Sequence, residues 1–241
     1  MLKIQVIPAA EQAHQDLRVT KNPEKTQEEG SIYGSSFGYL SWAYVTEDLY
    51  IPAHRKGAMD CYIYVLNQGH LNGDHIDEYS HVLEGDMVIM QSGATNAPQV
   101  KRIAPDFRAF EFWFTEEGLL KGFEKPDFLK IRATQFPMKI ENDVVVRQLF
   151  GENAPVSHIN GMTITELIVP PHAEYTYKLF ANRRLGMYVV RGEGNIGNKV
   201  YVKGDFVEAV QIDDPVDGII IHGGGELTSR LILIDIESLT Q

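Results

Sequence analysis

Residues 84–90 read Glu-Gly-Asp-Met-Val-Ile-Met, and residues 203–209 read Lys-Gly-Asp-Phe-Val-Glu-Ala. In both segments a Gly-Asp pair leads directly into a β-prone run. Glycine adopts positive φ angles freely, and an aspartate side chain can accept hydrogen bonds from the backbone of its own turn. Each segment therefore predicts a tight turn that enters a buried β-strand.

Other features recur around these turns in the same order. Tyr-Val-Leu-Asn-Gln-Gly at 64–69 is echoed by Tyr-Val-Val-Arg-Gly-Glu-Gly at 188–194. Upstream, Ile-Pro-Ala-His ending at His54 is echoed by Val-Pro-Pro-His ending at His172, and each half closes with a β-rich run. Because such a matched order rarely arises by chance, the chain is predicted to hold two copies of one fold.

Runs rich in β-branched and aromatic residues extend through both halves, and short strands at this spacing are typical of β-sandwiches and barrels. The predicted strands are Leu40–Val45, 60–66, Met87–Met90, Phe110–Phe114, Val144–Val146, Met162–Val169, Gly186–Val190, Phe206–Val210, Gly218–Ile221 and Leu231–Ile236. Asn72-Gly73 and Gly197-Asn198 are expected to be hairpin turns. A short helix is expected over Glu116–Phe123.

Composition narrows the class of protein. The chain has 241 residues, of which 44% are hydrophobic and 23% charged, as in globular proteins. Its net charge of −11 disfavours nucleic acid as a partner. No apolar run reaches the ~20 residues of a membrane helix, and no secretory signal is recognisable. A single cysteine, Cys61, fits a reducing compartment, so we expect a cytoplasmic protein.

The Pro-x-His segment, the Tyr-Val-Leu-x-x-Gly strand and the Leu-x-Gly-Asp turn, repeated in two halves, resemble the motifs of bicupins. Among bicupins they are similar to the pirin family, over roughly residues 30–115 and 140–238. The resemblance implies an all-β protein of two jelly-roll β-barrels packed face to face. We expect cupin domains at 1–115 and 144–241, joined by a linker with a short helix over 116–143, where the strand signal is weakest.

The resemblance also implies a metal site in the N-terminal barrel, from which this sequence departs. The first cupin motif is His-x-His with an acidic residue a few positions on. Here His54 fits the first place, Lys56 occupies the second, and Asp60 is the nearby acid. Non-haem Fe(II) is usually held by two histidines and a carboxylate. The ammonium group of Lys56 would repel a cation and favour an anion, so His54 is the one residual metal candidate.

The second cupin motif lacks its histidine as well. Cupin spacing puts Asn96 at the ligand position, pirin spacing puts Pro98 there, and Val100 stands where pirins often place a glutamate. In the C-terminal copy, His172 and Glu174 are the remaining donors. Both metal sites are therefore predicted to be lost.

Aromatic residues recur at every second position of two predicted strands, and such residues are most often found in a barrel core. The alternative interpretation is an aromatic-lined cavity for a planar ligand, oriented by a few polar groups. For that N-terminal cup, the candidate ligand-binding residues are His54, Lys56, Asp60, Tyr62, Asn96 and Phe112. The cation of Lys56 would favour a carboxylate, phenolate or phosphate.

Three functions remain open. The missing ligands favour a bicupin without a metal cofactor, which binds a small molecule or a protein and exists as a monomer or weak homodimer. The alternative is a metal-dependent oxidoreductase similar to quercetin 2,3-dioxygenases, with Fe(II) or another divalent metal in a non-standard ligand set around His54. A transcription-coupled partner, by analogy with pirin as an iron-dependent nuclear transcription cofactor, rests on fold likeness alone.

Overall fold

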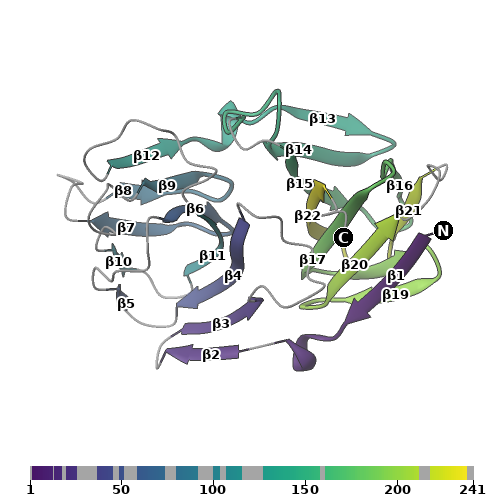
Figure 1. Ribbon diagram of the computed structural model, residues 1–241, viewed down its shortest axis with the longest axis horizontal. Coiled ribbons are helices and arrows are strands. Elements are labelled where there is room, and N and C mark those ends of the chain that lie inside the picture. The colour runs from purple at the N-terminus through teal and green to yellow at the C-terminus, as the bar shows by residue number, and fades with distance from the viewer. Residues whose placement is uncertain are drawn as a thin grey trace. The chain divides into compact units, whose positions relative to one another are not determined.

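The structure is a computed structural model, and it describes residues 2–12, 14–17, 20–25, 37–45, 49–51, 59–73, 80–91, 100–103, 107–115, 127–157, 161–211 and 218–237. The chain divides into two compact units. The N-terminal unit is Ala13–Gln135, and the C-terminal unit combines Met1–Gln12 with Phe136–Gln241. Within the described residues, each unit has one seven-stranded and one four-stranded sheet, so the predicted all-β class is confirmed (Figure 1).

The described residues of the N-terminal unit form antiparallel strands and the short 3-10 helix η3 (Ala133–Gln135). Its strands are β2 (His14–Leu17), β3 (Thr20–Lys25), β4 (Phe37–Val45), β5 (Leu49–Ile51), β6 (Met59–Val65), β7 (Gly69–Gly73), β8 (Ser80–Val82), β9 (Met87–Gln91), β10 (Val100–Ile103), β11 (Phe107–Thr115) and β12 (Asp127–Ile131). The large sheet runs β12-β9-β6-β11-β4-β3-β2, and the small sheet runs β5-β10-β7-β8.

The C-terminal unit repeats this plan, with a 3-10 turn η1 (Ala9–Glu11) near the start of the chain. Its strands are β1 (Leu2–Ile7), β13 (Met138–Glu141), β14 (Val144–Phe150), β15 (Met162–Val169), β16 (Glu174–Tyr177), β17 (Arg183–Arg191), β18 (Glu193–Ile196), β19 (Lys199–Val202), β20 (Phe206–Gln211), β21 (Ile219–Gly223) and β22 (Ser229–Glu237). The large sheet runs β1-β20-β17-β22-β15-β14-β13, and the small sheet runs β16-β21-β18-β19.

All of the predicted strands are present, but one predicted turn is wrong. Asn72 and Gly73 belong to β7, where they pair with Lys101 and Val100 of β10, because β10 lies alongside and extends the strand. Gly197 does form the predicted hairpin turn between β18 and β19, with φ 55°. The helix expected over 116–123 falls outside the described residues.

The two Gly-Asp turns have the same hydrogen bonds. The Val65 amide donates to the Asp86 carbonyl at 2.9 Å, and the Gly85 amide donates to the Val65 carbonyl at 2.8 Å. In the second copy, the Val189 amide donates to the Asp205 carbonyl at 3.0 Å, and the Gly204 amide donates to the Val189 carbonyl at 2.8 Å. These matched bonds support the predicted duplication and make Val65 the equivalent of Val189.

The aspartate side chains complete both turns, as expected from the sequence. Asp86 Oδ2 accepts from the Leu83 amide at 3.1 Å, and Asp205 Oδ2 accepts from the Val202 amide at 3.0 Å. The preceding glycines have φ angles of 85° and 91°, in the left-handed region that glycine enters without strain.

The domain boundaries differ from the predicted ones at both ends of the N-terminal domain. β1 pairs with β20 of the C-terminal unit (Figure 1), and the Gln12 side chain donates to the Gly204 carbonyl at 2.7 Å. The predicted linker 116–143 contains β12, which pairs with β9, and β13, which pairs with β14. These strands cover sheet edges that would otherwise expose unpaired backbone groups.

The core of the C-terminal unit lies between its two sheets. We call the face of a large sheet that packs against the small sheet its inner face, and the opposite face its outer face. The inner-face residues of the large sheet in this core include Val146, Leu167, Val169, Leu185, Met187, Val189, Val207, Ala209, Leu231 and Leu233, and the small sheet contributes Ile196, Tyr201, Ile219 and Ile221. No helix among the described residues is long and apolar enough to cross a membrane.

Candidate functional site

The duplicated turns define the inner face of the N-terminal unit. Val189 and Leu231 are opposite each other on the inner face of the C-terminal sheet. The equivalent pair in the N-terminal unit is Val65 and Ala109. Because side chains alternate between the two faces of a strand, Glu111 is then also on the inner face.

Three predicted cup residues lie on the outer face instead. Tyr62 is opposite Phe112, and Asp60 is opposite Phe114, so these side chains share the face that Tyr64 occupies. Their relative exposures are 3% for Asp60, 1% for Tyr62 and 0% for Phe112. The rings of Tyr62 and Phe114 are nearly perpendicular, with their centroids 5.2 Å apart, and burial together with the charge of Asp60 raises the pKa of Tyr62.

The structure therefore brings Asp60, Tyr62 and Phe112 together, but away from the barrel interior. The aromatic side chains are buried, as the core interpretation expects, although on the outer side of the sheet. The other candidates, His54, Lys56 and Asn96, fall outside the described residues, so their position in the cup stays a prediction.

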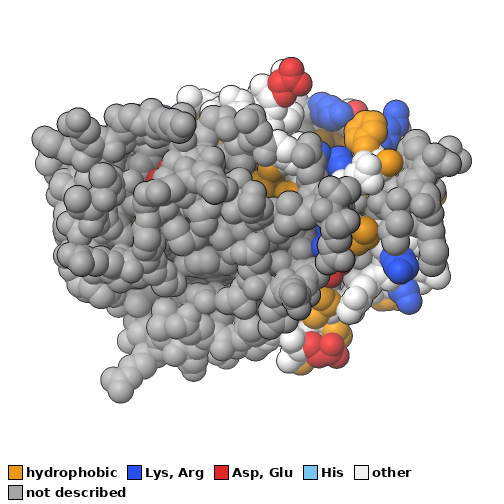
Figure 2. All heavy atoms as spheres, in the orientation of Figure 1, with side chains coloured by type: hydrophobic (Ala, Val, Ile, Leu, Met, Phe, Trp, Pro, Cys, Tyr) orange, Lys and Arg blue, Asp and Glu red, His pale blue; other side chains and the backbone are white. Residues whose placement is uncertain are grey.

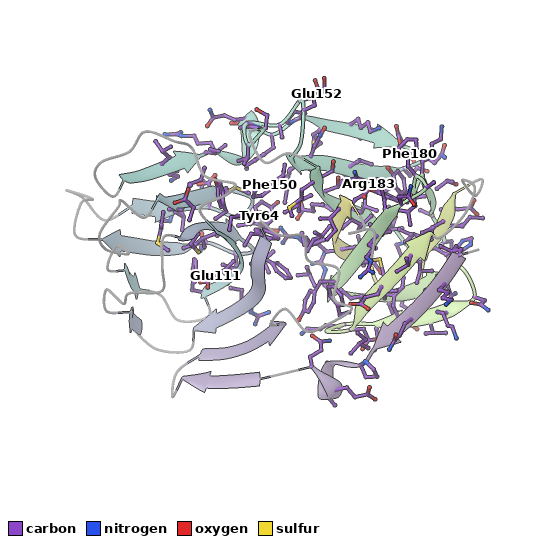
Figure 3. The ribbon with its side chains drawn as sticks, in the orientation of Figure 1. Tyr64, Glu111, Phe150, Glu152, Phe180 and Arg183 are labelled. Atoms are coloured by element: carbon purple, nitrogen blue, oxygen red, sulfur yellow. The ribbon has the colours of Figure 1, made fainter. Side chains whose placement is uncertain are left out.

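Glu111 on β11 is a functional candidate that the sequence reasoning missed (Figure 3). It is 5% exposed, and its partner across the sheet is Ile63 of β6. The equivalent residue of the C-terminal unit is Leu233, which is 1% exposed and opposite Met187. The N-terminal barrel therefore has a carboxyl group, an acceptor of hydrogen bonds, at the place where the C-terminal barrel has an apolar side chain. The sequence feature that could have identified Glu111 is that it is the single acidic residue in the aromatic segment 107–114.

The residual donors of the C-terminal copy face away from its barrel. His172 is exposed, with φ 62° in the turn before β16. On β16, Tyr175 and Tyr177 pack against the core, so Glu174 points outward and lies opposite His222 at 3.6 Å. Throughout the described ranges, no group of three His, Cys, Asp or Glu side chains is placed to hold a metal ion.

A cavity of about 530 Å³ opens at one end of the C-terminal barrel. Polar inner-face residues from neighbouring strands meet there: Gln148 of β14 is opposite Thr165 of β15, and Thr163 is opposite Asp235 of β22. Tyr175 of β16 lines the same space. The sequence reasoning did not find this cavity.

Asp235 is held by a hydrogen-bond network at the cavity wall. The Tyr177 hydroxyl donates to its Oδ2 at 2.7 Å, and Arg183 Nε donates to its Oδ1 at 2.5 Å. Arg183 also donates to the Gly161 carbonyl at 3.0 Å, which fixes the guanidinium group. Burial raises the pKa of Asp235 in spite of the nearby Arg183 charge, and burial beside Asp235 raises the pKa of Tyr177.

Solved structures with a similar fold include the bacterial pirin YhhW from Escherichia coli in complex with nickel(II), with a TM-score of 0.73 and 15% identity over 98% of this chain and 100% of that chain. Quercetin 2,3-dioxygenase from Acinetobacter baumannii matches with a TM-score of 0.73 and 14% identity over 98% of this chain and 79% of that chain. GK1651 from Geobacillus kaustophilus matches with a TM-score of 0.71 and 16% identity over 100% and 96% of the two chains.

No protein-family model and no curated protein sequence matches the chain. At the identities of the solved structures, the likeness establishes the fold. The chain has the pirin-like bicupin fold that the sequence motifs predicted.

Proposed function

We propose that the N-terminal barrel is a binding cup for a small molecule and that it works without a metal cofactor. Glu111 carries this proposal: a buried carboxyl group faces the interior of one barrel where the other has Leu233. A carboxyl group in this place can accept hydrogen bonds from a ligand inside the barrel, which a leucine cannot do, so Glu111 supports a role in binding.

The available donor set supports the absence of a metal. Fe(II) needs about three strong donors. Asp60 is on the outer face of β6, so it is not available as a donor inside the barrel. His54 and Glu111 together give two donors, while Lys56 adds a positive charge that opposes cation binding.

The same residues favour a small ligand with an anionic group and a hydroxyl group. Lys56 would pair with a carboxylate, phenolate or phosphate, and Glu111 would accept a hydrogen bond from the hydroxyl. An interior site of this kind suits a small molecule, because barrels of this size enclose at most one small ligand.

Tryptophan fluorescence offers a direct test. Both tryptophans, Trp42 on β4 and Trp113 on β11, belong to the N-terminal unit. We expect 4-hydroxybenzoate, 4-nitrophenol or phenyl phosphate to change this fluorescence saturably. Glu111→Leu and Lys56→Met should each weaken the effect about tenfold or more, the loss of one charge-assisted hydrogen bond.

The matched control for this experiment is Lys199→Met, since Lys199 is an exposed residue of β19 in the C-terminal unit. It should leave binding unchanged. Failure of all three probes to bind, or binding that neither Glu111→Leu nor Lys56→Met weakens, would contradict the proposal.

A metal-dependent dioxygenase of the quercetinase type is the second candidate. Its support is the carboxylate of Glu111, which could complement His54, together with the fold likeness to quercetin 2,3-dioxygenase from Acinetobacter baumannii. Protein loaded with Fe(II), Mn(II), Cu(II) or Ni(II) should then consume oxygen with quercetin. Tight stoichiometric metal binding with such turnover would favour this candidate over the metal-free cup.

A further inference from the structure

The cavity of the C-terminal barrel breaks the pattern of the core beneath it. Along β15 the inner-face residues change from Val169 and Leu167 to Thr165 and Thr163, and the last of these is opposite Asp235. The inner faces of β14 and β22 change from aliphatic to polar at the same end, at Gln148 and Asp235. Several strands thus supply polar groups to one layer at the open end of the barrel.

A core built for stability alone would remain aliphatic in this layer, because buried polar groups need partners. The Arg183–Asp235–Tyr177 network holds the carboxylate in a fixed position at the cavity wall. A preorganised carboxylate beside threonine hydroxyls and the Gln148 amide can exchange several hydrogen bonds with a hydroxylated molecule.

The charges around this cavity balance. Two lysines and two carboxylates line it, and Lys139 pairs with Glu141 at 2.6 Å. Arg183 and Glu152 line the adjoining cavity of about 410 Å³, so the two cavities together have three basic and three acidic side chains, and Arg183 is paired with Asp235 at 2.5 Å. Because paired charges give little net field, the site does not select a strongly charged ligand.

Aromatic surface completes the lining. Tyr175 is half-buried on β16, and Phe180, 63% exposed, borders both cavities (Figure 3). Figure 2 shows hydrophobic and basic side chains together on the surface around β13, where Met138 is 59% exposed. Aromatic rings beside a few fixed polar groups are typical of small-molecule sites, and a volume of about 530 Å³ is within their usual range.

We propose that this cavity is a second binding site, for a neutral, hydroxyl-rich small molecule of about monosaccharide size. The hydroxyl groups of the ligand bond to Asp235, Gln148 and the two threonines, while its C–H face packs on Tyr175 and Phe180. This site goes beyond the proposed function of the N-terminal barrel and does not depend on it.

The test uses the full chain, labelled with 15N, and a panel of probes of similar size. The neutral probes are glucose, galactose, mannose and myo-inositol, and the charged probes are gluconate and glucosamine. At least one neutral probe should shift the amide signals of Thr163, Thr165 and Asp235 saturably at millimolar concentrations, and more strongly than either charged probe.

Thr165→Val removes one hydroxyl with little change of shape, and it should raise the dissociation constant about tenfold. Gln148→Leu is a second variant with the same expected effect. Thr228→Val is the matched control, because Thr228 lines neither cavity, and it should bind like the wild type. The proposal is overturned if no neutral probe shifts these signals, if a charged probe binds more tightly, or if Thr165→Val and Gln148→Leu both bind like the control.

Discussion

Replacing Glu166 by alanine should destabilise the protein severely. The Glu166 side chain is 0% exposed and bridges two arginines of neighbouring strands. Its Oε1 accepts from Arg230 Nε at 2.6 Å, and its Oε2 accepts from Arg147 at 2.8 Å. The substitution leaves both guanidinium groups without this carboxylate, and the Arg230 side chain is only 8% exposed.

Removing one partner of a buried ion pair typically costs about 3–5 kcal/mol, because it leaves an uncompensated charge. A matched comparison isolates the effect of burial. Glu141 pairs with Lys139 at the similar distance of 2.6 Å, but the side chains are 44% and 60% exposed. Solvent screens such a pair, so Glu141→Ala should cost about 0–1 kcal/mol.

Urea denaturation followed by circular dichroism measures both variants against the wild type. Tryptophan fluorescence reports only on the N-terminal unit, whereas Glu166 belongs to the C-terminal unit. We therefore expect Glu166→Ala to lower the urea midpoint measured by fluorescence less than the midpoint measured by circular dichroism. A difference of less than about 1 kcal/mol between Glu166→Ala and Glu141→Ala would refute the reasoning, since burial would then have no measurable effect on the ion pair.

Three smaller changes test other parts of the C-terminal unit. Tyr177→Phe removes the 2.7 Å hydrogen bond to Asp235 and should lower the free energy of unfolding by about 1 kcal/mol in the same assay. Gly204→Ala should cost about 1–2 kcal/mol, because Gly204 has φ 91° and an added Cβ would come within 3.0 Å of the Ala9 Cβ; an unchanged urea midpoint would argue against this. The pKa of Asp235 is raised in the folded state, so the folded protein binds that proton more tightly than the unfolded chain. The free energy of unfolding of the wild type, relative to that of Asp235→Asn, should therefore fall as the pH rises from the ordinary pKa of 3.8 towards the raised pKa of the folded state. A relative free energy that rises over this pH range would contradict the raised pKa of Asp235.

The repeated turns made the fold predictable from the sequence. Local chemistry determines a Gly-Asp turn, and the hydrogen bonds at Asp86 and Asp205 follow from it. The pairing of β1 with β20 was not predictable in this way, because it joins segments about two hundred residues apart and depends on which sheet edge is open.

The candidate site was harder to predict, because strand periodicity gives two faces without saying which one is buried in the barrel. The sequence grouped Asp60, Tyr62 and Phe112 correctly on one face, but the register with Val65 and the duplicated turn puts that face outside. The polar layer of the C-terminal barrel was missed for a related reason: its residues come from separate strands and meet only through the register.

The metal content of the purified protein is the measurement that decides between a metal-free cup and a dioxygenase. The full chain is incubated with Fe(II), Mn(II), Cu(II) or Ni(II), desalted, and analysed by inductively coupled plasma mass spectrometry. We predict a metal content far below one ion per chain for each metal. Asp60 lies on the outer face of β6, which leaves too few donors for a metal ion, and the positive charge predicted for the cup at Lys56 opposes cation binding. Retention of close to one ion per chain, lost in His54→Ala and Glu111→Leu, would contradict the proposal and favour the metal-dependent alternative.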